Sequence, residues 1–240
     1  MLSLVTGKSS VRPAAVAGLF YPQDAAELRD TVIQLLGDAA PRGPARSQPK
    51  AMIVPHAGYT YSGMVAASAY RRLAESCASI RNVVLIGPSH RVPMRGLAMP
   101  SVDAFETPLG AIPIDRVARQ RLRELGLAGI SDAAHSAEHS LEVQLPFLQV
   151  VLPAFELLPI ATGLAPPALA ENDVLAFIGH VRTERLEHRH VRIDLARAKG
   201  AALHLMLQPR FTQPGEQAGD HHDAGAHRLR QRCLRPAADS

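Results

Sequence analysis

The chain has 240 residues, of which 47% are hydrophobic and 20% are charged, and this length suits one domain with a sizeable core. Only 4% of residues are aromatic and Trp is absent, so the core must be built from Ala, Leu, Val and Ile. Residues 181–240 hold 11 Lys and Arg against 7 Asp and Glu, which equals the whole net charge of +4. Residues 1–180 are therefore neutral overall, and nucleic acid is not an expected partner.

No segment has the pattern of a signal peptide or of a membrane span. The longest apolar-rich stretch, residues 141–170, is interrupted by charged residues and prolines. We therefore expect a cytoplasmic protein that has no membrane partner.

Apolar periodicity predicts alternating helices and strands along the chain. The helices are expected at residues 25–36, with Asp24 as the N-cap, and then near 64–73, 116–125 and 141–151. The strands are expected at residues 51–54, 82–86, 96–99 and 156–160. This order predicts an α/β fold with a central, mostly parallel sheet that is flanked by helices.

Two histidines follow two of the expected strands. His56 comes directly after the strand at 51–54, in the run PHAGYTYSG, and His90 ends the run GPSH after the strand at 82–86. A strand, helix, strand unit places both carboxyl ends at one edge of the sheet, where ligand sites of open α/β sheets lie. The two imidazoles can therefore converge on one metal ion. The alternative is that each histidine only binds loop backbone at the end of its strand.

A third group of ionisable side chains lies between residues 135 and 147. Glu138 and Glu142 are four residues apart, as are His135 and His139, so either pair can share one face of a helix. These groups can form a proton relay or orient a metal ligand. They can equally form the solvated start of a helix, where glutamate is favoured.

Several of these runs together resemble the Memo family, whose bacterial and archaeal members are called AmmeMemoRadiSam system protein B. The matching runs are VAGLFYP at 16–22, PHAGYTYSG at 55–63, GPSH at 87–90, TPLG at 107–110 and EHSLEVQLPFL at 138–148, with a weaker match at 158–163. Their order and spacing cover residues 11–163, about two thirds of the chain. Five separate matches in the same order are hard to obtain by chance.

The resemblance implies a fold similar to that of the class III extradiol dioxygenases, also called LigB-like. It implies that His56 and His90 bind a metal ion, with iron expected and copper or zinc as alternatives. His139 and Glu142 match polar residues near the family's pocket and are the candidate catalytic residues. Apart from the resemblance, Tyr59 and Tyr61 are the candidate cofactor-binding residues, because their hydroxyls can line a pocket; the alternative is that they are half-buried packing residues. The family name also implies a functional link to AMMECR-like and radical SAM proteins.

The last part of the chain departs from the family pattern. The family continues with a Ser-Ser-Asp strand end and later a Cys-Gly pair, whose cysteine is a third metal ligand, and neither is readable here. Residues 181–240 instead contain ten Arg, six His and one aromatic residue, Phe211. We therefore divide the chain into a Memo-like α/β domain, residues 1–178, and a divergent tail, residues 179–240.

The tail has two explanations, a frameshift in a GC-rich gene or a divergent, disordered segment. One choice of codons for residues 231–235 reads Ser-Asp-Ala-Cys-Gly after a shift of one base. Under either explanation Cys233 is not assigned as a metal ligand. A frameshift would leave the sheet and the pocket incomplete.

Three functions are consistent with the sequence. The first is a metal-binding protein of the Memo type whose enzymatic reaction is unassigned. The second is a non-catalytic protein that binds a small molecule or a peptide, as the signalling role of the human family member suggests. The third is an impaired product of a frameshifted gene.

Overall fold

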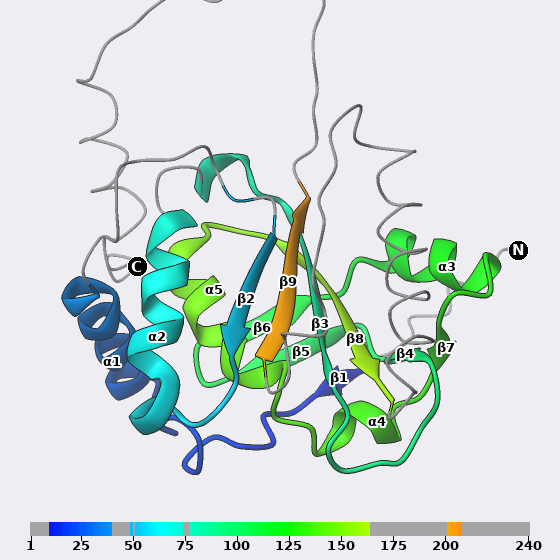
Figure 1. Ribbon diagram of the computed structural model, residues 1–240, viewed down its shortest axis with the longest axis horizontal. Coiled ribbons are helices and arrows are strands. Elements are labelled where there is room, and N and C mark those ends of the chain that lie inside the picture. The colour runs from blue at the N-terminus through cyan, green and yellow to red at the C-terminus, as the bar shows by residue number, and fades with distance from the viewer. Residues whose placement is uncertain (1–9, 40–48, 50, 74–76, 164–200, 208–240) are drawn as a thin grey trace, which may run out of the picture.

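The computed structural model (Figure 1) describes residues 10–39, 49, 51–73, 77–163 and 201–207. The strands are β1 (Val11–Arg12), β2 (Ala51–Pro55), β3 (Asn82–Pro88), β4 (Leu97–Met99), β5 (Ala104–Thr107), β6 (Gly110–Pro113), β7 (Gly129–Ile130), β8 (Glu156–Thr162) and β9 (Ala201–Leu207). The α-helices are α1 (Ala25–Asp38), α2 (Tyr59–Tyr70), α3 (Arg116–Glu124), α4 (Ala133–Ser136) and α5 (Leu145–Val151). Short 3-10 turns lie at Arg71–Leu73, Cys77–Ser79 and Glu142–Gln144.

The expected α/β fold is confirmed, but the sheet is mixed and not mostly parallel. The main sheet has six strands in the order β2-β9-β3-β8-β4-β7. Only β3 with β8 and β4 with β7 pair in parallel, whereas β9 is antiparallel to both its neighbours and β4 is antiparallel to β8. Strands β2 and β3 still run in the same direction, because each pairs antiparallel with β9. Their carboxyl ends therefore share one edge of the sheet, as predicted.

Strand β9 comes from the segment that the sequence analysis assigned to a divergent tail. It lies between β2 and β3, and Ala51 pairs with Leu205 while Val84 pairs with the same residue from the other side. A segment with weak strand signals thus occupies a central position, which the local sequence pattern did not predict. The other expectations for the tail fall on residues 179–200 and 208–240, outside the described residues.

Helix α1 begins as predicted, because the Asp24 carboxylate accepts hydrogen bonds from the backbone N–H groups of Ala26 and Glu27. Helix α2 begins five residues before the expected start at residue 64. Tyr59 is buried there, its ring is 4.9 Å from that of Phe147, and its hydroxyl donates to the Val143 carbonyl. These tertiary contacts outweigh the weak helix propensity of a Gly- and Tyr-rich segment.

The two faces of the main sheet are covered by different helices. Helices α1, α2 and α5 pack on one face, and their core includes Leu28, Tyr70, Leu85 and Phe147. Figure 1 shows α1 and α2 beside β2, with α3 at the far edge near β4 and β7. A second cluster joins Leu122 of α3 to residues of β3, β4 and β8. In the part of the chain that is described, no helix is long and apolar enough to cross a membrane.

The segment that precedes α1 is anchored by a buried carboxylate. Glu142 is fully buried and pairs with Arg12 at 2.6 Å. The same carboxylate accepts hydrogen bonds from the Tyr21 hydroxyl at 2.6 Å and from the backbone N–H groups of Ala15 and Val16. Arg12 in turn lies in β1, which joins β5 and β6 in a separate three-stranded sheet. One carboxylate thus ties the small sheet and the N-terminal loop to the core.

The substitution Glu142→Gln is expected to lower the free energy of unfolding by about 3–5 kcal/mol, because it leaves the buried Arg12 cation unpaired. Denaturant unfolding of the purified protein measures the change. Glu124→Gln is the matched control, since Glu124 forms an exposed ion pair with Arg121 and its loss should cost less than about 1 kcal/mol. Equal losses in the two variants would contradict the assignment.

His135 is a buried histidine whose backbone carbonyl accepts a hydrogen bond from the Arg12 side chain. Its side chain is 2% exposed, and its Nε2 atom lies 3.0 Å from the Ala98 carbonyl oxygen. Burial lowers the pKa of His135 to about 4, although the Ala98 carbonyl partly offsets the shift. Between pH 6.5 and about 4 the unfolded chain therefore binds a proton that the folded chain does not.

The unfolding free energy is accordingly expected to be unaffected by His135 above pH 6.5 and to fall as the pH drops toward 4. The loss attributable to His135 is on the order of 3 kcal/mol. Denaturant unfolding at a series of pH values checks this, with His135→Gln as the comparison. The variant should lose less stability on acidification than the parent protein, and parallel curves for the two would rule out the assigned role.

Candidate metal centre

Three histidines meet at the edge of the sheet where β2 and β3 end. His56 follows directly after β2, and His90 lies two residues after β3. His139 comes from the segment between α4 and the 3-10 turn at Glu142–Gln144. The sequence predicted the convergence of His56 and His90, and the structure adds His139 to them. We refer to His56, His90 and His139 as the histidine cluster.

The histidine cluster has the geometry of a candidate metal site. One ligand atom from each ring lies within 4.8 Å of the others. The ring centroids of His90 and His139 are 4.6 Å apart, and that of His56 is 5.2 Å from His90 and 5.7 Å from His139. His56 is buried, His139 is partly buried and the His90 side chain is 39% exposed. The cluster thus has a buried end and an end that solvent reaches.

The electrostatics of the cluster keep the rings available as ligands. Burial, together with the neighbouring His90 and His139, lowers the pKa of His56 to about 4. Burial also lowers the pKa of His139, against the attraction of Glu138. Both rings are therefore neutral near pH 7, which is the form that binds a metal ion.

The donor set fits a transition metal better than calcium or magnesium. Three imidazole nitrogens suit iron, copper or zinc, whereas calcium and magnesium prefer oxygen ligands. The buried Nδ1 atoms of His56 and His139 also have no hydrogen-bond partner within the described residues. The buried Nδ1 atom of His135, outside the cluster, has none either, so these atoms agree with a bound ion but do not by themselves indicate one. The residues present therefore fit a transition-metal ion.

Glu138 supports the histidine cluster. From sequence it was one of a group that could relay protons or orient a metal ligand, but it was not among the residues given a specific role. Its side chain is 2% exposed, and it accepts hydrogen bonds from the backbone of His90, from the His90 ring, and from the backbone N–H groups of His139 and Ser140. Burial raises the pKa of Glu138, but the hydrogen bonds from His90 and Ser140 outweigh it and lower the pKa to about 2. Glu138 is thus a carboxylate at neutral pH. Its place beside His139 in the sequence was the available signal.

Glu142 and His135, from the same segment, lie elsewhere. The Glu142 carboxylate is occupied by Arg12, Ala15, Val16 and Tyr21, and its side chain is fully buried. These contacts give Glu142 a structural role, and its catalytic role stays a prediction that they do not favour. The expected helix with His135 and His139 on one face does not form, because α4 ends at Ser136.

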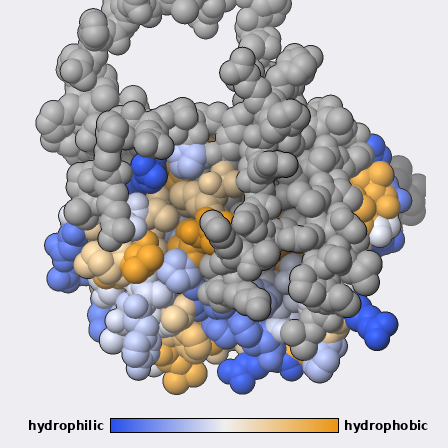
Figure 2. All heavy atoms as spheres, viewed as in Figure 1, coloured by the Kyte–Doolittle hydropathy of each residue, from blue (hydrophilic) through white to orange (hydrophobic). Residues whose placement is uncertain are grey.

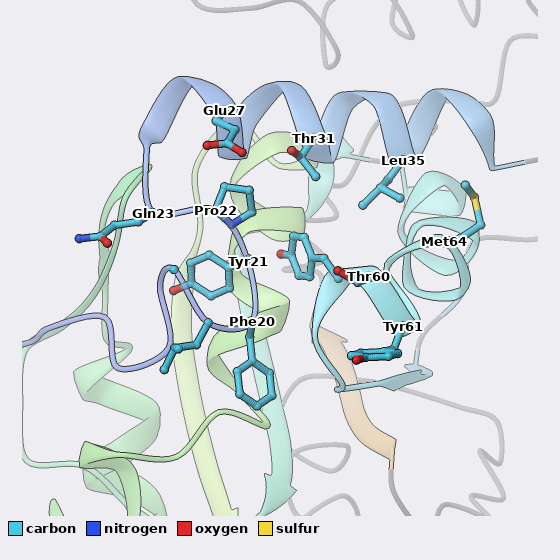
Figure 3. A pocket seen from close by; sticks show the side chains of 13 residues that line it. Phe20, Tyr21, Pro22, Gln23, Glu27, Thr31, Leu35, Thr60, Tyr61 and Met64 are labelled. Atoms are coloured by element: carbon cyan, nitrogen blue, oxygen red, sulfur yellow. The ribbon is translucent and has the colours of Figure 1, made fainter.

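The two tyrosines predicted to bind a cofactor line a groove next to the histidine cluster. The groove has a volume of about 680 Å³, and α1, α2 and the loop before α1 form its walls. Figure 3 shows Glu27, Thr31 and Leu35 along one wall and Tyr61 on the other. Tyr61 is 87% exposed, whereas the hydroxyl of the buried Tyr59 is bound to the Val143 carbonyl. Of the two tyrosines, only Tyr61 therefore has a largely exposed side chain in the groove.

Phe20 joins the groove to the histidine cluster. Its ring lines the groove and lies 4.6 Å from the ring of His139. The neighbouring Leu19 is 80% exposed. On the face shown in Figure 2, patches of hydrophobic side chains lie among hydrophilic ones. In the sequence, Phe20 stands out only as part of the run VAGLFYP. Phe20 thus packs against a member of the histidine cluster and also belongs to the wall of the groove.

Comparisons with known proteins identify the family to which the chain is similar. A family model described as Memo-like protein matches residues 12–193. A MEMO1 family protein of Aquifex aeolicus is 41% identical over 175 residues, which cover 72% of this chain and 62% of the relative. Relatives of the same name in Ignicoccus hospitalis and Methanothermobacter thermautotrophicus are 41% and 38% identical, over 67% and 71% of this chain and 59% and 61% of their own lengths.

The matches cover most of this chain but only part of its relatives. The chain spans about three fifths of the length of these curated relatives. The family model continues past residue 178, where the sequence analysis placed the start of the tail, and stops at residue 193. Most of the described structure, including all three histidines of the cluster, lies within the match. The chain therefore belongs to the Memo-like protein family.

Proposed function

We propose that this chain is a metal-binding Memo-family protein in which His56, His90 and His139 bind one iron ion, with copper or zinc as the alternatives. The observation that carries the proposal is the convergence of three imidazole ligand atoms within 4.8 Å of one another. The neutral state of His56 at pH 7 and the unsatisfied Nδ1 atoms of His56 and His139 support it. Imidazole is a favoured ligand of all three metals.

The surroundings of the cluster suggest how the site would be used. The exposed side of His90 gives a small molecule or a peptide access to the cluster, and the groove that Phe20 helps to line is a second place where such a molecule would bind. A bound iron or copper ion would supply Lewis-acid or redox chemistry at this edge of the sheet. Phe20 lines the groove and its ring lies 4.6 Å from that of His139, so a molecule bound in the groove would act on the cluster through Phe20. The likeness to extradiol dioxygenases and the link to AMMECR-like and radical SAM proteins remain predictions.

Loading the purified protein with ferrous iron and measuring metal by elemental analysis tests the proposal. The parent protein is expected to retain one ion per chain after desalting, and His56→Ala and His90→Ala are expected to retain little. His135→Gln is the matched control, because His135 is buried nearby but is not part of the histidine cluster. Equal metal content in the parent protein and His56→Ala would refute the proposal.

A second candidate function is non-catalytic binding of a small molecule or a peptide. It is favoured by the groove of about 680 Å³ and by Tyr61, which is 87% exposed on its wall. Binding that is lost in Tyr61→Ala but is unchanged in His56→Ala would indicate this function. Binding that is lost in both variants would instead indicate that one molecule occupies the groove and depends on the metal site.

A third candidate is an impaired product of a frameshifted gene. It is favoured by the composition of residues 181–240 and by the family match, which stops at residue 193. Translation of the gene in all three frames checks this. A Ser-Ser-Asp or Cys-Gly segment in another frame downstream of residue 163 is the expected result, and its absence from every frame would exclude the frameshift.

A further inference from the structure

The carboxylate of Glu138 lies between two members of the histidine cluster. Its Oε1 atom is 2.9 Å from Nδ1 of His90 and 3.3 Å from Nδ1 of His139. The first contact has hydrogen-bond geometry, whereas Nδ1 of His139 has no hydrogen-bond partner within the described residues. Glu138 therefore acts directly on the ring of His90 and only at a longer range on that of His139.

The contact with Glu138 determines which nitrogen of His90 carries the proton. A carboxylate only accepts hydrogen bonds, so a neutral His90 must donate from Nδ1. Its Nε2 atom is then left with a free lone pair. Because the Glu138 side chain is 2% exposed, water does not replace this hydrogen bond readily. A metal ion would therefore meet His90 in a single tautomer.

The backbone contacts of Glu138 fix the position of the ring as well. The carboxylate also accepts from the backbone N–H groups of His90, His139 and Ser140. The Ser140 hydroxyl donates to the Pro88 carbonyl at the end of β3, at 2.8 Å. At Gly87, a Cβ atom would lie 2.9 Å from the Ser140 hydroxyl oxygen, so the two segments are in close contact there. These contacts hold the loop of His90 against the segment of His139.

We propose that Glu138 is a positioning residue of the metal centre, which fixes the Nδ1-protonated tautomer of His90 and the placement of its ring relative to His139. The expected effect on metal affinity rests on the proposed metal-binding function, whereas the tautomer of His90 does not. A carboxylate that binds the distal nitrogen of a ligand histidine raises ligand basicity and orients the ring. Loss of such a partner typically weakens metal binding about 10- to 100-fold.

The tautomer of His90 is measured first, in the metal-free parent protein, by long-range correlation of its ring protons and nitrogens in NMR spectra. The expected result for the neutral ring is a proton on Nδ1 and none on Nε2. A neutral His90 ring that carries its proton on Nε2 would overturn the proposal. This measurement needs neither a variant nor a metal, so it decides the role of Glu138 even if the metal-binding function is wrong.

The second measurement compares Glu138→Gln with the parent protein in titrations with cobalt(II), followed by its absorption spectrum. The variant is expected to bind about 10- to 100-fold more weakly, to show a changed cobalt spectrum and to lose the single His90 tautomer. The matched control is Asp115→Asn, because Asp115 is a buried carboxylate that bonds Asn82 and Ala118 instead of a histidine. The control should bind cobalt as the parent does.

The possible results separate the two proposals. A parent protein that binds no metal refutes the proposed function, while its His90 tautomer still decides the role of Glu138. Unchanged affinity and an unchanged tautomer in a folded Glu138→Gln variant overturn the positioning role. Equal weakening in Glu138→Gln and Asp115→Asn also overturns it, since a general loss of stability would then explain the effect.

Discussion

The structure depends on the need to satisfy buried charge in the segment between His135 and Glu142. Glu142 is fully buried and Arg12 is nearly so, and the two are 2.6 Å apart. Arg12 also donates to the backbone carbonyls of His135 and Glu138. A buried carboxylate and a buried guanidinium are stable only when their hydrogen-bonding capacity is filled. Filling it draws the N-terminal strand, the loop before α1 and the segment that carries His139 to one place.

Glu138 and Glu142 fix this segment through hydrogen bonds to different parts of the chain. Glu142 binds groups on the N-terminal side, and Glu138 binds the loop that follows β3. The segment is thus fixed from two sides, and His139 lies between the two anchors in the sequence. His56 follows directly after β2, whereas His90 follows β3 and is also held by Glu138. The histidine cluster therefore combines placement by the strands of the main sheet with placement by buried carboxylates.

Local sequence patterns predicted the parts of the site that depend on the sheet. The apolar runs before His56 and His90 indicated strands that end at one edge, and the structure places both rings there. The same patterns could not reveal Glu138 as a partner of His90, because the contact joins residues 48 positions apart. Glu142 matched the pocket region of the family, yet its partners, Arg12 among them, lie more than 100 residues away in the sequence. A carboxylate that serves chemistry and one that fills a structural need look alike in sequence.

The sheet itself shows a similar limit. The pattern of strands and helices predicted that β2 and β3 run in the same direction, which is correct, but not that β9 separates them. The residues of β9 lie in a segment rich in Arg and His, where strand signals are weak. Its place is defined by pairing with two neighbours instead of by its own pattern. Long-range pairing of this kind overrides local preference.

The most direct test of this account is a crystal structure of the iron-loaded protein with an anomalous difference map recorded at the iron edge. The account predicts one strong peak within bonding distance of a ring nitrogen of His56, His90 and His139, with Nδ1 of His90 still facing Glu138. A peak at another place in the molecule, or a histidine cluster without a peak in protein that retains iron, would contradict it.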